Sequence, residues 1–143
     1  MPIDPSFSGL PLEVVRGAAL ERAVTLGCGD AEVRIERIRS QVVVVRDGQV
    51  ETTVDDTEVG VGVRVVRDRS VGFAATVEIQ SDAAAELADR AVAMAAATAP
   101  ALAVPVDLAP EPGYGSVEWS SAFEIDPTTV TVADKAALLS DWS

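Results

Sequence analysis

The chain has 143 residues, of which 48% are apolar and 24% charged, and its formal net charge is -12. This length and apolar content suffice for one domain with a hydrophobic core. The excess of acids argues against binding to nucleic acid or to an anionic membrane, because phosphate contacts need clustered Lys and Arg. The sequence has no His and a single Cys, Cys28. These counts exclude His-dependent catalysis, His-containing zinc sites and an intrachain disulfide.

The sequence also lacks the usual signals for membrane insertion or export. No run approaches the ~18 consecutive apolar residues of a spanning helix. The first five residues lack the basic and apolar regions of a signal peptide. We therefore expect a soluble, cytoplasmic chain.

The first predicted element is a helix from about Pro11 to Leu26. Pro11 suits the first helical position, where its missing N–H costs nothing. Apolar residues recur at three- and four-residue spacing and define one face, made of Leu12, Val15, Ala19, Ala23 and Leu26. Gly27 follows, and it can adopt the left-handed conformation common after a helix end.

From Ala31 the apolar pattern changes to a period of two, which predicts strands. Asp47-Gly48 separates two β-rich runs and indicates a tight hairpin turn. Asp55-Asp56 is interpreted as a second turn, and the segment 67–70 as a third. The predicted strands are residues 31–36, 41–46, 49–54, 58–66 and 71–79, the fourth with Val59, Val61, Val63 and Val65 on one face.

An Ala-rich helix is predicted from Ser81-Asp82 to Thr98, ended by Pro100. Its small residues would let it lie close against the sheet, and its predicted inner face comprises Ala84, Leu87, Ala88, Ala91, Met94 and Ala95. Several Pro and Gly residues then break regular structure. In the tail we expect one short strand at 118–123 and an amphipathic helix at 133–142.

These elements together predict an α+β fold, with an antiparallel meander of about four to five strands, two helices on one face and an irregular Pro/Gly-rich tail. The expected domain is residues 1–100. Residues 101–143 are interpreted as a linker and the start of a truncated second domain. They carry half of the net charge, -6 of -12.

Three local patterns suggest chemistry but have plainer interpretations. Gly60-Val61-Gly62 lacks the strand-to-helix context of a dinucleotide-binding loop, so its glycines are expected on the strand face opposite the valines, where they permit a bulge or a close backbone approach. Asp55, Asp56 and Glu58 resemble an acid–base or metal cluster, but a solvated turn explains them better. Cys28 follows a helix C-terminus, where the dipole raises a thiol pKa, so a nucleophile is not expected.

Seven Arg residues between positions 34 and 69 suggest a site for an acidic peptide or phosphate. Glu and Asp are interleaved with them, so cross-strand pairing on a solvated face is the simpler interpretation. Aromatic residues of the tail, including Trp119, are interpreted as anchors onto the first domain or contacts to a second one. The candidate residues facing a substrate or partner are Arg34, Arg46, Arg64, Gly60, Gly62 and Trp119.

An ordered series of segments resembles the N-terminal domain of the TldD/PmbA family, also called the modulator of DNA gyrase family. The series includes Asp30-Ala31-Glu32-Val33-Arg34, then Arg46-Asp47-Gly48, then Gly60-Val61-Gly62-Val63-Arg64, then Val71-Gly72-Phe73-Ala74-Ala75-Thr76 and the Ala-rich helix. It spans residues 12–98. Residues 126–139 resemble the family's connection to its second domain.

The resemblance implies a two-domain zinc metallopeptidase that assembles as a homodimer or as a heterodimer of paralogous subunits. The family's zinc motif, HExxxH with a later Cys, lies in the C-terminal domain, so no cofactor is expected in this chain and zinc is expected in the missing domain. The implied role is a non-catalytic domain that shapes the proteolytic cavity and helps bind a peptide or protein substrate or a partner subunit. The alternative is a free-standing protein- or peptide-binding module. Binding to DNA or gyrase has little support at this net charge.

Overall fold

The computed structural model describes residues 4–143, so Met1–Ile3, part of the segment considered above for targeting, lie outside it. The chain divides into two compact units. Among the described residues, the core unit consists of 4–37 and 59–113, and the arm unit consists of 38–58 and 114–143. Each unit is described by itself below.

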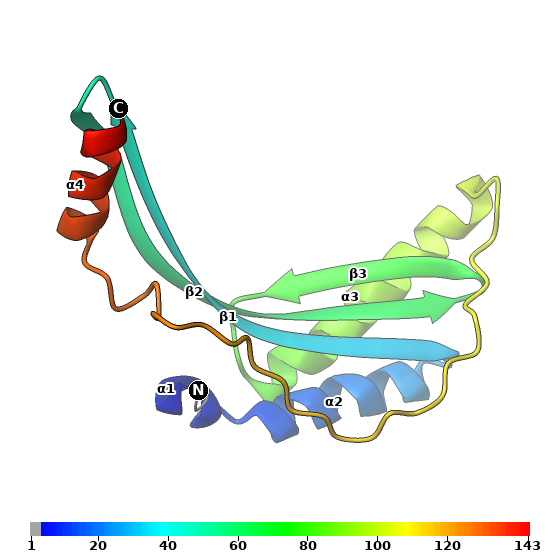
Figure 1. Cartoon of the computed structure of the whole chain (residues 1–143). Coiled ribbons are helices and arrows are strands. Elements are labelled where there is room, and N and C mark those ends of the chain that lie inside the picture. The colour runs from blue at the N-terminus through cyan, green and yellow to red at the C-terminus, as the bar shows by residue number, and fades with distance from the viewer. Residues whose placement is uncertain (1–3) are drawn as a thin grey trace. The chain divides into compact units, whose positions relative to one another are not determined.

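The described residues form an α+β fold, as predicted, with the element order shown in Figure 1. The strands make one sheet in the order β1-β2-β3, and β2 pairs antiparallel with β3. The elements are α1 (Pro5–Ser8), α2 (Leu12–Thr25), β1 (Asp30–Arg46), β2 (Gln49–Arg67), β3 (Ser70–Thr76), α3 (Ser81–Thr98), a 3₁₀ turn (Ala99–Ala101) and α4 (Val132–Trp142).

The sheet has three strands among residues 4–143, fewer than the four to five predicted. Residues 30–46 form one continuous strand, and residues 49–67 form another. The turn predicted at Asp55-Asp56 was wrong, because both residues lie inside β2. The carboxylate of Asp55 pairs with Arg39 of β1, so a cross-strand ion pair holds this polar dipeptide in the strand.

The two tight turns of the meander are confirmed. Asp47 and Gly48 both have positive φ, 50° and 71°, as a two-residue hairpin turn requires. The second turn has the same backbone conformation at Asp68 and Arg69, with φ of 51° and 60°. Arg69 therefore occupies a left-handed position that favours Gly.

The core unit buries the valines of β2 under α2 and α3, which lie on the same face of its sheet (Figure 1). Val61, Val63 and Val65 are at most 2% exposed. The buried helix residues are mostly small: Val15, Ala19 and Ala23 from α2, and Ala84, Leu87, Ala88, Ala91, Val92 and Ala95 from α3. The predicted face of α3 is confirmed except for Met94, which is 50% exposed, whereas Val92 is buried instead.

The close approach of α3 to the sheet is most direct at Gly72 of β3. A Cβ added to Gly72 would lie 1.8 Å from the carbonyl oxygen of Ala91, so only Gly fits there. Nearby, the buried hydroxyl of Ser70 lies 2.9 Å from the hydroxyl of Thr98. Asp89 of α3 also forms an ion pair with Arg22 of α2 at 2.7 Å.

Three further boundaries differ from the predictions. The N-cap of α3 is Gln80, with no side-chain cap hydrogen bond, so neither Ser81 nor Asp82 caps the helix. The strand β3 ends at Thr76 rather than Ile79. Residues 118–123 are irregular, because no neighbouring strand pairs with them, and the short strand predicted there was wrong.

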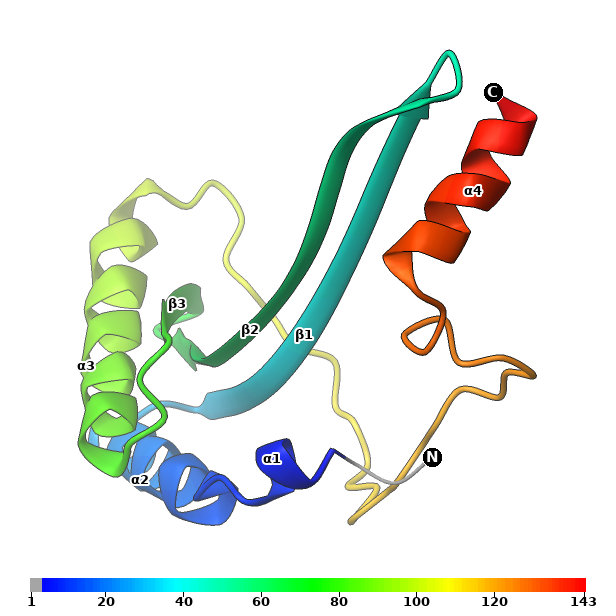
Figure 2. The ribbon, with the colours of Figure 1, turned by 90° about the vertical axis from the view of Figure 1, so that its left-hand side faces the viewer.

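The arm unit contains the outer part of the β1–β2 hairpin and the helix α4, which lies beside it (Figure 2). The predicted helix at 133–142 is confirmed, and Thr131 caps it by accepting a hydrogen bond from the Asp134 amide at 3.1 Å. Half-buried residues of α4, including Val132, Ala136 and Leu139, recur at helical spacing. No described residue of this unit is fully buried.

Candidate partner-binding surfaces

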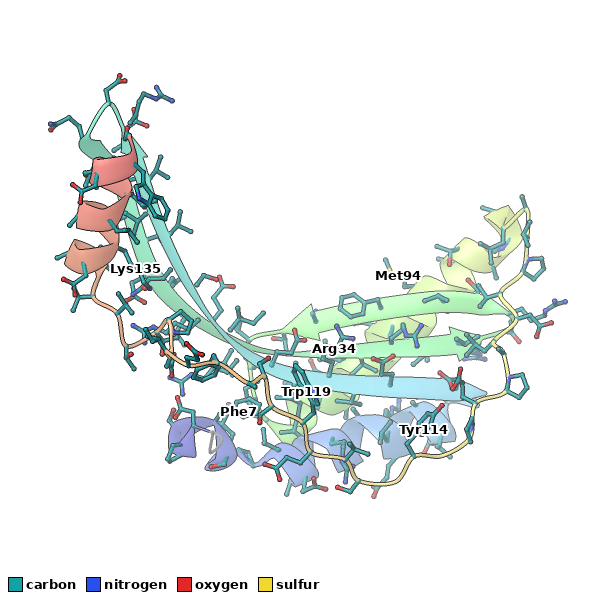
Figure 3. The ribbon with its side chains drawn as sticks, viewed as in Figure 1. Phe7, Arg34, Met94, Tyr114, Trp119 and Lys135 are labelled. Atoms are coloured by element: carbon teal, nitrogen blue, oxygen red, sulfur yellow. The ribbon has the colours of Figure 1, made fainter. Side chains whose placement is uncertain are left out.

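The outer face of the sheet in the core unit carries two of the candidate arginines. The face opposite the helices presents Glu32, Arg34 and Glu36 from β1 and Arg64 from β2. Arg64 binds the carboxylate of Glu32 at 2.7 Å, and Arg34 lies 3.6 Å from Glu32 and 3.7 Å from Glu36. The structure therefore brings Arg34 and Arg64 together around the carboxylate of Glu32, in a paired and partly exposed arrangement. Figure 3 labels Arg34 on β1.

Gly60 and Gly62 lie on this same outer face of β2, opposite the buried valines. A Cβ at Gly62 would meet the ring of Phe73 at 3.0 Å, and one at Gly60 would meet the carbonyl oxygen of Thr76 at 3.3 Å. Gly62 thus leaves room for the Phe73 ring to lie across the neighbouring strand, an arrangement in which an aromatic side chain covers a strand glycine. The ring remains 54% exposed, so the face keeps an apolar patch beside its charges.

The other two candidates belong to the arm unit. Arg46 pairs with Glu51 across the hairpin at 3.3 Å and is otherwise exposed. Trp119 lies in the irregular segment and is 81% exposed. An indole with this exposure contributes little to the stability of the unit, because it leaves little of its apolar area buried.

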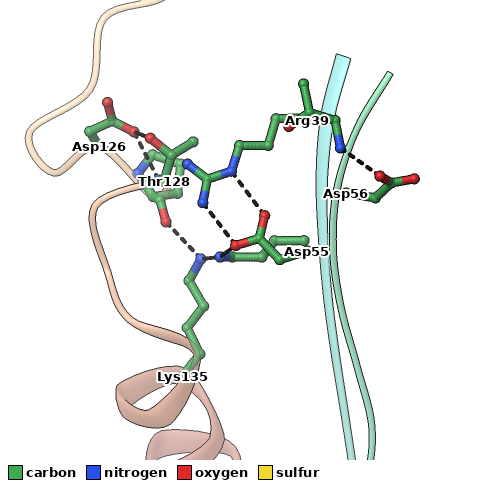
Figure 4. Close-up of polar contacts among 9 residues, drawn as sticks. Arg39, Asp55, Asp56, Asp126, Thr128 and Lys135 are labelled. Carbon is green, nitrogen blue, oxygen red and sulfur yellow. Dashed lines mark hydrogen bonds and ion pairs between the residues drawn. The ribbon is translucent and has the colours of Figure 1, made fainter.

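A polar cluster joins the C-terminal segment to the hairpin within the arm unit (Figure 4). The guanidinium of Arg39 donates to both carboxylate oxygens of Asp55 at 2.9 and 2.8 Å. The amide of Gln41 donates to Asp55 at 2.9 Å. From α4, the ammonium of Lys135 donates to the side-chain oxygen of Gln41 and to the carbonyl of Pro127, the latter at 2.6 Å.

The electrostatics of this cluster favour ionised carboxylates. Hydrogen bonds from Arg39 and Gln41 lower the pKa of Asp55 from 3.8 to about 2, and the charges of Arg39 and Lys135 act in the same direction. The pKa of Asp126 is also lowered, chiefly because its carboxylate accepts hydrogen bonds from the side chain and amide of Thr128. The cations of Arg39 and Lys135 thus act on the carboxylates of Asp55 and Asp126. These four residues come from the hairpin and from the C-terminal segment.

Sequence reasoning missed this cluster because it placed Asp55 in a turn. The signal was present in the sequence: β-rich residues continue on both sides of Asp55-Asp56, and an Arg at position 39 is available on the preceding strand. A pair of opposite charges on neighbouring strands is a recognised source of sheet stability. The single Lys of an otherwise acidic tail, Lys135, was the second signal.

The residues of this chain do not fit a zinc site. Zinc in proteins is held by Cys, His and carboxylate groups in close tetrahedral array. The sequence has no His, and no three Cys, Asp or Glu side chains gather in a metal-binding arrangement in the described part of the chain. Burial raises the pKa of the Cys28 thiol, and the charge of Arg67 only partly opposes this, so the thiolate that binds metal is disfavoured.

Within residues 4–143, no helix combines the length and apolarity that crossing a membrane requires. The longest helix, α3, has 18 residues and is amphipathic, with its buried face against the sheet.

The architecture defines the class of protein: an α+β domain whose antiparallel sheet is covered by helices on one face and open on the other. Residues 31–95, which run from β1 through most of α3, match the family model of PmbA/TldA metallopeptidase domain 1. The match over residues 31–95 confirms the resemblance to the first domain of the PmbA/TldD family that was seen in the sequence. The match covers a little under half of the chain. No curated protein matches the chain significantly.

Proposed function

We propose that this chain serves as a non-catalytic domain of a zinc-dependent peptidase of the PmbA/TldD family. In this role the zinc ion is held by a separate catalytic domain, and this domain shapes the cavity and binds a peptide substrate or a partner subunit. The observation that carries the proposal is the match of residues 31–95 to the first domain of these metallopeptidases.

Two features of the core unit support a binding role. The outer sheet face combines the exposed Phe73 ring with the paired charges of Arg64 and Glu32. A large exposed aromatic beside charged groups is typical of surfaces that meet another protein. The chain has no His and one Cys, and its carboxylates do not gather into a metal-binding group among the described residues, so the proposal assigns zinc binding and hydrolysis to another domain.

The test is to isolate the tagged chain from its own cells and to measure zinc and peptidase activity in the complex. We expect a zinc-binding polypeptide with an HExxxH motif, joined covalently or as a subunit, and hydrolysis of unfolded peptides that a chelator abolishes. The purified 143-residue chain should neither retain stoichiometric zinc nor cleave those peptides. Zinc-dependent cleavage by that chain alone would contradict the proposal.

The second candidate function is a free-standing protein-binding module, and the exposed apolar side chains of the arm unit favour it. Val42, Val44 and Val50 of the hairpin are each at least 40% exposed. A stable stoichiometric complex that contains this chain but neither zinc nor peptidase activity would favour this second function over the first.

A further inference from the structure

The tip of the hairpin in the arm unit carries the one dipeptide of the sequence in which Gly follows Asp, Asp47-Gly48. Both residues are exposed, and both have positive φ. Gly48 has no Cβ, so its main-chain nitrogen is open to approach from the preceding side chain. The turn thus joins a carboxyl group to an unhindered amide nitrogen at an exposed position.

These two groups can react with each other without a co-reactant. The Gly48 nitrogen attacks Cγ of Asp47, an N–Cγ bond forms, and the carboxyl hydroxyl leaves with the amide proton as water. The product is a five-membered succinimide, whose closure is favoured because both groups belong to one short segment. Water then opens the ring at either carbonyl carbon. Opening at Cγ restores Asp47, whereas opening at the main-chain carbon gives isoaspartate, in which the main chain runs through the side chain.

The closed turn opposes this reaction. The ring fixes the torsion about the Cα–C bond of Asp47, and a two-residue hairpin turn fixes that torsion at a different value. In addition, the Gly48 amide donates a hydrogen bond to the Ser143 hydroxyl, directly after α4, at 3.2 Å. Ring closure therefore requires the turn to open and this hydrogen bond to break.

Opening of this turn disturbs little buried structure. No described residue of the arm unit is fully buried. The C-terminal segment contacts the hairpin through polar groups, among them the pairs Lys135–Gln41 and Ser143–Gly48. Segments with few buried apolar contacts open locally at a low cost in free energy. We therefore expect the tip to open while the core unit stays folded.

The second tight turn, Asp68-Arg69, provides an internal comparison. Its φ values, 51° and 60°, are close to those of the tip. It lies in the core unit, where the Arg69 carbonyl accepts a hydrogen bond from the Val106 amide at 2.8 Å and Ser70 is fully buried. Arg69 also places a Cβ and a long side chain beside the nitrogen that would attack. Similar backbone conformations thus occur with Gly in the arm unit and with Arg in the core unit.

We propose that Asp47-Gly48 is a site of spontaneous isoaspartate formation, and that docking of α4 on the hairpin slows this modification. Isoaspartate places one additional carbon atom in the main chain, so the modified tip no longer forms a two-residue turn and loses its contact with Ser143. The modification therefore changes the local order of the arm unit and leaves the core unit folded. This inference is independent of the proposed function.

The first experiment incubates the 143-residue chain in H₂¹⁸O at neutral pH for several weeks. Each passage through the succinimide incorporates one ¹⁸O atom, which mass spectrometry of proteolytic peptides assigns to a residue. Methylation by a protein-isoaspartate methyltransferase measures the isoaspartate itself. Because the sequence has no Asn, no signal arises from deamidation of Asn. We expect both signals at Asp47 and neither above background at Asp68.

The second experiment uses variants to test the role of α4. Ser143→Ala removes the acceptor of the Gly48 amide and should raise the rate at Asp47 about two- to tenfold, the effect of one hydrogen bond on the opening equilibrium. Lys135→Ala, which removes the contacts to Gln41 and to the Pro127 carbonyl, should raise it at least as much. Ser121→Ala, at an exposed position outside the hairpin and α4, is the matched control and should react like the parent. In urea all four chains should react at the same rate, because α4 is no longer docked.

Three results would overturn the inference. A rate at Asp47 no higher than that at Asp68 would refute the assigned site. Parent-like rates for both Ser143→Ala and Lys135→Ala would refute the role of α4. The third is an increase for Leu87→Ala, which truncates a fully buried side chain of the core unit, as large as that for Ser143→Ala. That result would show that the modification requires global unfolding. None of these results bears on the zinc content of the native complex, so the proposed function is tested separately.

Discussion

The core unit and the arm unit are stabilised by different interactions, although β1 and β2 run through both. The core unit buries a continuous set of apolar residues, with Leu87 and three valines of β2 at its centre. The arm unit has no fully buried residue in the described chain. Its C-terminal segment contacts the hairpin through the polar cluster around Arg39, Asp55 and Lys135.

This difference shows that the same two strands can run through one region with a buried apolar core and another without one. Burial of apolar area is the dominant stabilising term in folding, and it is concentrated in the core unit. Exposed ion pairs contribute little and are weakened by salt. We therefore expect substitutions in the core unit to change global stability, and substitutions in the arm unit to change local order.

The largest expected effect is that of Leu87→Ala in the core unit. Leu87 is fully buried in α3, and its truncation leaves a cavity, so the free energy of unfolding should fall by ~2–5 kcal/mol. Urea denaturation followed by circular dichroism measures it. Leu138→Ala, at a 51% exposed position of α4, is the matched control and should change that free energy by less than ~0.5 kcal/mol. Equal losses for the two variants would refute the contrast between the units.

The next effect is that of Gly72→Ala. The added methyl group would collide with the Ala91 carbonyl, so α3 must move away from β3, at a cost of ~1–3 kcal/mol of unfolding free energy. Thermal or urea unfolding measures the loss. Gly29→Ala is the control, because nothing lies within 4 Å of a Cβ at Gly29. Parent-like stability of Gly72→Ala would mean that α3 does not pack this closely on the sheet.

A smaller effect of opposite sign is expected for Arg69→Gly. Arg69 has φ of 60°, whereas the equivalent position in the arm hairpin is already Gly48. Relief of the left-handed strain should raise the unfolding free energy by ~1 kcal/mol, after allowance for the greater flexibility of Gly in the unfolded chain. The midpoint of urea unfolding should increase. An unchanged or lower midpoint would show that the Arg69 side chain offsets the backbone strain.

The smallest effect on global stability, and a clear local one, is expected from acid titration of the arm unit. The pKa of Asp55 is lowered from 3.8 to about 2 in the folded chain, so its contribution is present above pH 4 and is lost as pH falls toward 2. Amide chemical shifts of α4 should therefore change between pH 4 and 2. Asp55→Asn should show the acid-like shifts already at pH 6, while Asp56→Asn, its neighbour outside the cluster, should titrate like the parent. Identical titration of both variants would contradict the assigned role of Asp55.

Much of the core unit could be predicted from the sequence because its signals are local. The spacing of Val15, Ala19 and Ala23 defined the buried face of α2, and the alternation of Val61, Val63 and Val65 defined the buried face of β2. Asp47-Gly48 identified a turn because few other dipeptides tolerate positive φ at both positions. The family resemblance was carried by these same segments and was confirmed over residues 31–95.

The length of the strands could not be predicted, because it depends on contacts between distant residues. Asp55 and Asp56 have the composition of a turn, whereas in the structure β2 continues through them and Asp55 pairs with Arg39 on the neighbouring strand. The position of Met94 also depends on tertiary contacts: it matches the spacing of the buried face of α3, but it is 50% exposed and accepts a hydrogen bond from the Phe73 amide of β3.

The sequence by itself determined the fold class, the two tight turns, most of the buried faces of the helices and the resemblance to the PmbA/TldD family, since each follows from residue types at short spacing. Only the tertiary structure decided which strand became an edge, how closely α3 approaches Gly72 and which charges pair in the arm unit. These properties depend on distances between segments remote in sequence, and local conformational preferences carry no information about them.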